Sequence, residues 1–248
     1  MNNFFFFIDN LLITFSAISI YIFTFVSNFF MKRVNFYVDG FNLYYGLKDM
    51  KKIDSDWLKF YWLDYVKFFQ HFVGEDQILQ KVVYFAAPPP TSSDPQGVVR
   101  QRILFNANKL LNHNKFELVL GQFYNKNITC KVCKSIFSVS EEKRTDVNIA
   151  VRIVGDCALD NVDTIVLVSA DSDLVPPLQF IKKYFPDKQI RVYFPPSHFS
   201  IALNGFMKTC KKPVVRLEQS KAKFFKSIMP DTVSTEGKTF TIPPNWKV

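Results

Sequence analysis

The 248-residue sequence has few of the two residue types that most often build disulfide frameworks and soft-metal sites. It contains four cysteines and three histidines. Four scattered cysteines are too few for the disulfide framework of a small secreted domain, so a reducing compartment such as the cytoplasm is expected. The histidines lie outside every motif described below, and each is expected to have a surface or packing role: His71, His113 and His198.

Charge is missing from a long stretch near the N-terminus. Residues 11–30 contain no charged side chain and are about long enough to span a bilayer. Lys32 and Arg33 follow, and the positive-inside rule would leave the rest of the chain in the cytoplasm. However, the first expected strand begins at about Val34, and two residues reach only ~7 Å, which hardly lets a buried strand clear a membrane surface. Two interpretations of residues 1–30 therefore stay open, a membrane helix and an accessory or over-extended start.

The remaining composition fits a folded domain with a basic surface. Hydrophobic residues make up 48% of the chain, and the net charge is +9. Asp9 is the one charged residue among residues 1–30, so the rest of the chain carries +10. Such a charge indicates a polyanionic partner, although ordinary solubility explains it equally well.

Apolar strand-like runs alternate with helix-like segments along the chain. This alternation predicts an α/β fold, doubly wound around a mainly parallel sheet that is flanked by helices. Several runs are continuously apolar, as strands covered on both faces are. The expected strands are 34–39, 79–86, 116–124, 163–170, 189–194 and 213–217. The expected helices are 56–72, 97–112, 146–159 (with Thr145 as N-cap), 174–184 and 198–210.

The domain is expected to cover residues 31–218, with an insertion at 125–139. That insertion contains Cys130 and Cys133, which form half of a structural zinc site. No second pair of this spacing follows, so the alternatives are a degenerate site without zinc and a zinc ion shared in a homodimer. Residues 219–248 are basic and are expected to form an irregular tail.

Four aspartates carry the clearest functional signal. Asp39 ends one apolar run, Asp171 and Asp173 follow another, and Asp146 begins the third expected helix. Ligands of parallel sheets bind beyond the carboxyl ends of the strands, so these segments should converge. Clustered carboxylates are costly without a positive partner, and their hard oxygens suit Mg²⁺ or Mn²⁺. Each aspartate alone could be a turn or cap residue, Asp173 for the helix that follows it.

The segments around these aspartates resemble the NYN domain family, in particular the LabA-type members of the PIN-like nuclease superfamily. The similar segments are 38–43, 141–150, 168–176 and 191–196. The resemblance covers about 34–217 and implies a PIN-like, Rossmann-like fold and a metal-dependent ribonuclease activity. It assigns the acidic metal-binding positions to Asp39, Asp146, Asp171 and Asp173, and matches Asn42 to the family's asparagine. Ala170 and Leu174 depart from the glycine and phenylalanine that are usual in the family.

Hydrolysis of an RNA phosphodiester needs an activated water and stabilisation of the charge that develops on the phosphate, which divalent ions supply. Asn42 and Ser169 are candidates for orienting water or phosphate, although turn and cap hydrogen bonds explain them as well. Lys48 lies near aromatic residues and is a candidate for contacting single-stranded RNA, whose bases stack on aromatic rings. The nearby residues of this kind are Lys51, Lys52, Tyr44, Tyr45 and Trp57, and a solvated helix face over buried aromatics would look the same.

Two other functions compete with a ribonuclease. Asp171-Ser172-Asp173 is similar to the DxD motif of nucleotide-sugar transferases, but that interpretation gives no role to Asp39 or Asp146. A non-catalytic RNA-binding or regulatory module would keep the fold and the aspartates, and would bind metal without turnover.

Overall fold

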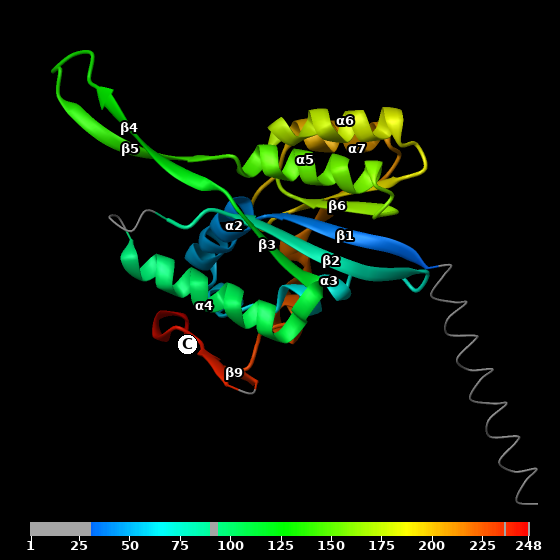
Figure 1. Ribbon diagram of the computed structural model, residues 1–248, viewed down its shortest axis with the longest axis horizontal. Helices are drawn as coiled ribbons and strands as arrows, with labels where there is room; N and C mark the ends of the chain where they lie inside the picture. The colour runs from blue at the N-terminus through cyan, green and yellow to red at the C-terminus, as the bar shows by residue number, and fades with distance from the viewer. Residues whose placement is uncertain (1–30, 90–93, 236, 248) are drawn as a thin grey trace, which may run out of the picture.

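A six-stranded parallel sheet forms the centre of the computed structural model, which describes residues 31–89, 94–235 and 237–247 (Figure 1). The strand order is β3-β2-β1-β6-β7-β8, which confirms the expected doubly wound α/β fold. The strands are β1 (Lys32–Asp39), β2 (Gln77–Ala86), β3 (Phe116–Leu120), β6 (Thr164–Val168), β7 (Gln189–Phe194) and β8 (Val215–Arg216).

Helices cover both faces of this sheet (Figure 1). Alternate residues of β1 enter different cores, because side chains of a strand point to opposite faces. Phe36 and Val38 pack with α2 (Gly40–Ile53), α3 (Tyr65–Gln70), α4 (Pro95–Asn112) and α8 (Lys221–Lys226). Tyr37 packs with α5 (Thr145–Ala158), α6 (Val175–Tyr184) and α7 (Ile201–Thr209).

The strand order reverses between β1 and β6. From β1 the chain first builds one half of the sheet outward through β2 to β3, and later returns to place β6 on the other side of β1. Val38 lies beside Val168 in the parallel pairing, so the two strands end together. This is the switch point at which α/β sheets bind their ligands.

The expected helix over 56–72 is wrong. In this range the chain forms a 3₁₀ helix (Ser55–Tyr61) and α3, and the α2 helix that precedes them was not expected. A capping aspartate precedes each of these segments, and its side chain accepts a hydrogen bond from a backbone N–H of the first turn: Asp39, Asp54 and Asp64. These caps divide an aromatic-rich stretch that looks continuous in the sequence.

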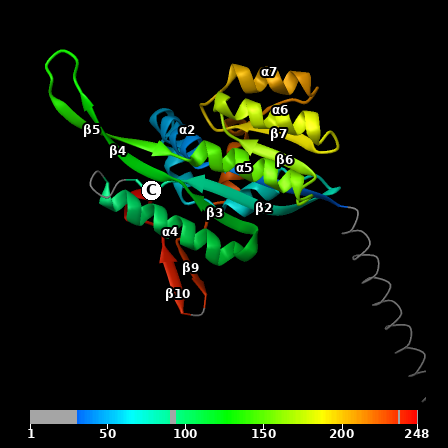
Figure 2. The same cartoon turned by 45° about the horizontal axis from the view of Figure 1, so that its top comes forward.

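The expected strand over 116–124 is two strands in the structure. β3 ends at Leu120, and β4 (Gln122–Thr129) then pairs with β5 (Ile136–Lys143) in an antiparallel hairpin that projects from the body of the protein (Figures 1 and 2). The break falls at Gly121, whose N–H donates to Ala86 O at 2.8 Å. A Cβ there would lie 2.6 Å from Thr145 Oγ1. The expected insertion at 125–139 is therefore the outer part of a longer hairpin.

The segment after Leu217 is ordered, and the expectation of an irregular tail over 219–248 is wrong. Phe224 is fully buried, with its ring 4.2 Å from that of Phe68. The indole N–H of Trp62 donates to Pro230 O at 2.8 Å. These contacts pack the segment against the core that contains Phe36 and Val38. The elements of the segment are α8, β9 (Thr232–Thr235), β10 (Lys238–Thr241) and a 3₁₀ helix (Pro244–Trp246) (Figure 2).

Both interpretations of residues 1–30 concern a part of the chain outside the described residues. Within the described ranges, no helix is long and apolar enough to cross a bilayer.

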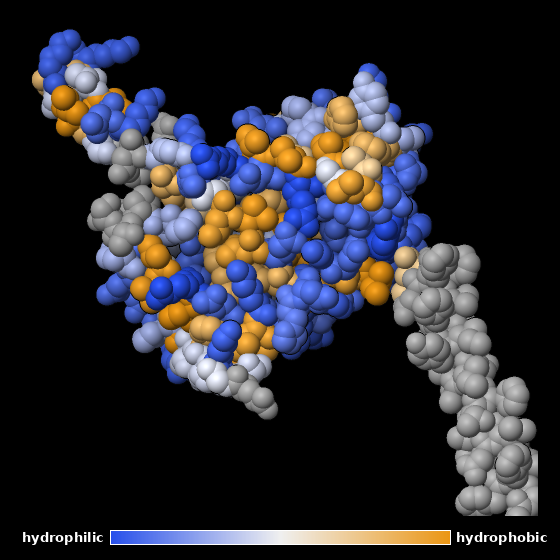
Figure 3. Space-filling view, viewed as in Figure 1, coloured by the Kyte–Doolittle hydropathy of each residue, from blue (hydrophilic) through white to orange (hydrophobic). Residues whose placement is uncertain are grey.

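Apolar side chains gather on the face that carries β3 and α5 (Figure 3). The exposed large apolar residues of these two elements are Leu120, Val147 and Val151. The expected homodimer stays a prediction.

Candidate functional site

Asp39 is the buried centre of the candidate site. It is the last residue of β1 and is 2% exposed. Its Oδ1 accepts a hydrogen bond from Asn42 N at 3.0 Å, and its Oδ2 accepts from Asn42 Nδ2 at 2.5 Å and from Ser169 Oγ at 2.8 Å. Burial raises the pKa of the Asp39 carboxyl, and these hydrogen bonds oppose the rise. The carboxylate is therefore fixed in orientation before any ligand arrives.

Asn42 and Ser169 tie the end of β1 to the end of β6. Ser169 Oγ donates to Asp39 and accepts from Asp171 N at 3.0 Å. Asn42 Oδ1 accepts from Ala170 N at 3.4 Å. Ser169 is fully buried. The Asn42 and Ser169 side chains thus hold the two strand ends together. In the structure, both candidates contact Asp39 and the backbone that follows β6.

Asp171 and Asp173 lie in the turn that leaves β6. Asp171 precedes a 3₁₀ helix (Ser172–Leu174), and its Oδ1 accepts from Asp173 N at 2.9 Å. The cap of this turn is therefore Asp171, and the alternative in which Asp173 caps the following helix is wrong. Asp173 is exposed at the rim.

Asp146 lies in the first turn of α5, as expected. The proposed N-cap, Thr145, is wrong, because the residue before the helix is Arg144, with φ 79° and no side-chain cap hydrogen bond. Glu142 satisfies the helix start instead. Its Oε1 accepts from Thr145 N at 3.2 Å and also from the Thr145 hydroxyl.

The four aspartates influence one another electrostatically. Asp146 is exposed at the surface, yet partial burial of its carboxyl raises its pKa to about 6, together with neighbouring negative charges. Those charges belong, in decreasing order of effect, to Asp171, Asp39, Glu142 and Asp173. Sequence reasoning missed Glu142, although it lies four residues before Asp146 within the motif 141–150.

The donors suit a hard divalent cation, because all of them are carboxylate oxygens. The aspartate side chains do not yet form a complete coordination shell. In the described part of the chain, no three His, Cys, Asp or Glu side chains lie close enough together to hold one metal ion.

Lys48 lies about two and a half turns along α2 from Asp39, at a pocket of about 420 Å³. Its Nζ is 5.5 Å from the centre of the Tyr45 ring. Trp57, the third aromatic residue considered for RNA contact, is 2% exposed and belongs to the core. The other walls of this pocket come from segments distant in the sequence, among them β2, α4, β4 and the C-terminal segment, and no motif marks them.

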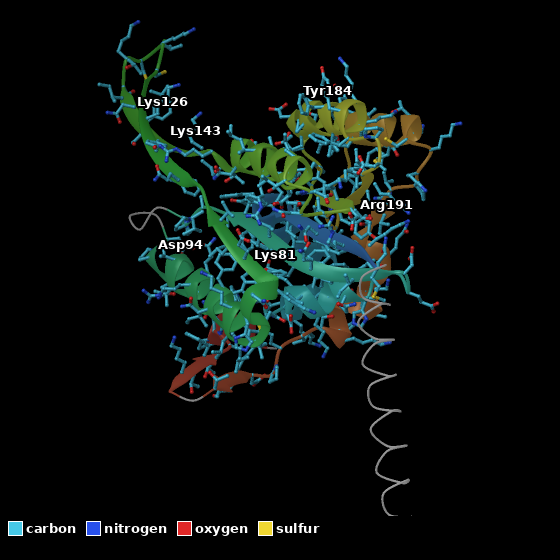
Figure 4. All side chains as sticks on the ribbon, turned by 45° about the vertical axis from the view of Figure 1, so that its right-hand side comes forward. Lys81, Asp94, Lys126, Lys143, Tyr184 and Arg191 are labelled. Carbon is cyan, nitrogen blue, oxygen red and sulfur yellow. The ribbon has the colours of Figure 1, made fainter. Side chains whose placement is uncertain are left out.

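Cys130 and Cys133 lie in the turn of the β4–β5 hairpin, away from the aspartates (Figure 1). Lys126 and Lys143 mark the course of the hairpin in Figure 4. Cys133 Sγ lies 2.6 Å from Ser135 Oγ. Hydrogen bonding from Ser135 lowers the pKa of the Cys133 thiol to about 7. Zinc binding by this pair stays a prediction.

Comparison with known protein families agrees with the motifs. The sequence profile of the NYN domain matches residues 33–209. The enzyme 6-hydroxy-3-succinoylpyridine 3-monooxygenase HspA of Pseudomonas putida is 27% identical over 195 residues, which cover 66% of this chain and 60% of that relative. The match thus spans less than two thirds of the relative's length. A solved structure of a Vibrio parahaemolyticus protein of unknown function is similar with a TM-score of 0.47 and 20% identity, over 76% of this chain and 94% of that chain.

Proposed function

This chain belongs to the NYN domain family, and we propose that it is a metal-dependent endoribonuclease that hydrolyses single-stranded RNA. The family connects the chain to the PIN-like nuclease superfamily. The single observation that carries the proposal is that Asp39 and Asp171 meet at the switch point, where the Ser169 hydroxyl contacts both residues. The charges of Asp171, Asp39, Glu142 and Asp173 also raise the pKa of Asp146. A cluster of this kind favours the binding of a cation.

In the proposed enzyme, Asp39, Asp146, Asp171 and Asp173 hold Mg²⁺ or Mn²⁺. When bound, such an ion lowers the pKa of a water molecule and stabilises negative charge on a phosphate. Asp39 needs little reorganisation for this task, because three hydrogen bonds already orient it. Asp173 and Asp146 are exposed, so they can adjust when the ion binds.

Asn42 and Ser169 act as positioning residues in this proposal. They contact Asp39 and the backbone that carries Asp171, and thereby set the distance between the two strand ends. The net charge of +9 attracts a polyanion to the rim. The four cysteines are free, which accords with the proposed cytoplasmic location.

The test compares wild type with Asp171→Asn. Millimolar Mn²⁺ should raise the melting temperature of the wild type, because ligand binding to the folded state stabilises it. The substitution should remove most of this increase and abolish cleavage of a single-stranded RNA oligonucleotide. Asp76→Asn is the matched control, since Asp76 is exposed and directly precedes β2, at the end of the strands opposite to the cluster. It should change neither property.

Four results would contradict the proposal in different ways. Undiminished cleavage by Asp171→Asn would separate catalysis from the cluster. A melting temperature that does not respond to Mn²⁺ would remove the metal site. Metal-dependent stabilisation and RNA binding without any cleavage would favour the non-catalytic RNA-binding module, and transfer of a sugar from a nucleotide sugar would favour the DxD interpretation.

A further inference from the structure

A pocket of about 420 Å³ opens beside the acidic cluster. Its volume falls in the range of roughly 300–1,000 Å³ that small-molecule sites occupy. One wall is a single face of α2, formed by residues three and four positions apart: Phe41, Tyr44, Tyr45 and Lys48. Asn42 belongs to a different face of the same helix, because its side chain bonds to Asp39. The pocket and the cluster therefore lie against different faces of the first turns of α2.

The pocket has aromatic walls with exposed ring surface. Tyr44 and Tyr45 are 43% and 46% exposed, so part of each ring is open to a ligand. Deeper in the wall, the Tyr44 ring lies 5.7 Å from that of Tyr61, which in turn lies 5.8 Å from Trp246. On the other side, Phe41 and Phe123 are 5.8 Å apart. Packed inner rings fix the outer ones, so the exposed rings are pre-oriented surfaces for a planar ligand.

Two cations border these rings. Arg100 lines the pocket from α4 and is held by Asp94, at 3.2 Å between Nη2 and Oδ2. Lys48 lines it from α2 above the Tyr45 ring. An aromatic site bordered by Lys and Arg suits a planar group that carries phosphates, since every base has a face for stacking and every nucleotide has a negative charge.

The position of the pocket connects it to the cluster. Gly40 lines the pocket and directly follows Asp39, and Ala86 lines it from the carboxyl end of β2. We propose that this pocket binds one unpaired nucleobase of the RNA strand, beside the phosphodiester that lies at the aspartates. This inference rests on the proposed ribonuclease function, because the strand must reach both places at once.

The first test measures RNA binding without cleavage. A fluorescently labelled single-stranded RNA oligonucleotide is titrated with full-length protein in EDTA, and anisotropy gives Kd. Tyr44→Ala and Tyr45→Ala should each weaken binding about tenfold, the size expected for the loss of a base–aromatic stack. The corresponding Phe variants keep a stacking ring and should bind as the wild type does. Tyr184→Ala is the control, because Tyr184 is 55% exposed on α6, across the sheet from Asp94 (Figure 4).

The second test asks whether a single base occupies the pocket. Oligonucleotides that each lack one base are compared with the intact strand. For the wild type, removal of the base at one position should lower the affinity about tenfold. For Tyr44→Ala, removal of the same base should not lower the affinity further. Equal losses in wild type and variant, or alanine variants that bind like the wild type, would overturn the proposal.

The binding measurements separate this inference from the proposed activity. If RNA binds with the predicted position dependence but is never cleaved, the ribonuclease proposal fails and the base pocket stands. If RNA is cleaved while both tyrosine variants and every base-free strand behave like the wild type, the pocket proposal fails alone. A last outcome concerns hydroxypyridines, the class of compound in the name of the Pseudomonas putida relative. If a free hydroxypyridine bound saturably at Tyr44 while RNA binding did not respond to Tyr44→Ala, the pocket would be a small-molecule site and the proposal would be overturned.

Discussion

The hydroxyl of Ser169 donates a 2.8 Å hydrogen bond to the buried carboxylate of Asp39 and so joins two strand ends that lie 130 residues apart in the chain. The same oxygen accepts from Asp171 N. One buried hydroxyl therefore orients one aspartate by its side chain and a second by its backbone. Because Ser169 has no exposed surface, its contribution is to the geometry of the acidic cluster.

We expect Ser169→Ala to destabilise the protein by about 1–3 kcal/mol at pH 7, the cost of removing a partner from buried polar groups. The lost hydrogen bond stabilises the charged form of Asp39, so the pKa of this carboxyl should rise further. The penalty should therefore be smaller at pH 4, where the carboxyl takes up a proton, than at pH 8. Urea unfolding at both pH values measures it. Ser172→Ala, at an exposed serine three residues later, is the control, and an equal loss in both variants would contradict this role.

The raised pKa of Asp146 predicts a pH dependence in the absence of divalent ions. In the folded protein this carboxyl titrates at about 6, above its ordinary value of 3.8. The folded state thus keeps a proton that the unfolded chain releases, and the contribution of Asp146 to stability falls as the pH rises from about 4 to about 6. Asp171→Asn should lower the pKa of Asp146, because Asp171 is the neighbour whose charge raises it most.

Carboxyl ¹³C NMR titration of wild type, Asp171→Asn and Asp76→Asn measures this effect. Asp76→Asn should leave the pKa of Asp146 unchanged, because Asp76 lies at the start of β2. Added Mg²⁺ should lower the apparent pKa in the wild type, since a cation favours the charged form. An Asp146 titration that is identical in all three proteins would mean that the aspartates do not share one site.

The sequence was sufficient to predict the sheet and the position of the aspartates. Buried parallel strands are continuous apolar runs, so their ends are visible, and Asp39 and Asp171 stand directly at two of them. The topology then brings the ends of β1 and β6 together, as the strand order requires. The part of the site that depends on strand ends could thus be predicted without a structure.

Other features depend on partners that are distant in the sequence. Phe224 and Trp246 lie in a basic stretch, and their contacts with the distant Phe68 and Tyr61 help to give that stretch a core. Local capping was also underestimated. Asp54 has the same chemistry in a turn and at a helix start, and only the hydrogen bond from Asp56 N distinguishes the two. The proposed base pocket combines several such distant segments, so the sequence indicated only its α2 wall, with Tyr44, Tyr45 and Lys48.

Substitution by alanine should have opposite effects on stability at two helical glycines, because one lies in close contact with β2 and the other faces open space. A Cβ at Gly40 would lie 2.4 Å from the backbone oxygen of Phe85, whereas a Cβ at Gly155 in α5 has no atom within 4 Å. Gly40→Ala should cost about 1–3 kcal/mol, because backbone must move to relieve the overlap. Gly155→Ala should stabilise by about 0.5–1 kcal/mol, since alanine is the better helix former. Chemical denaturation measures both, and a destabilised Gly155→Ala protein would contradict the open environment around that residue.

The hairpin cysteines should react with thiol reagents in an order set by their pKa values. Hydrogen bonding from Ser135 lowers the pKa of the exposed Cys133 thiol to about 7, whereas burial raises that of Cys157 to about 11. At pH 7, Cys133 should therefore be alkylated first and Cys157 last, because the thiolate is the reactive form. Ser135→Ala should slow the reaction of Cys133 by raising its pKa. Peptide mass spectrometry over a time course gives these rates.

The same cysteines separate the hairpin from the acidic cluster. The turn that carries Cys130 and Cys133 lies at the tip of the projecting hairpin (Figure 1). Replacing both with serine should leave Mn²⁺-dependent RNA cleavage and the melting temperature unchanged, because neither contributes to the core or to the charges around Asp146. Zinc content and oligomeric state are measured on the same samples. If the double variant lost stoichiometric zinc, dimerisation and cleavage together, a zinc ion shared between two hairpins would be part of the active protein, and the hairpin would need to be included in the site.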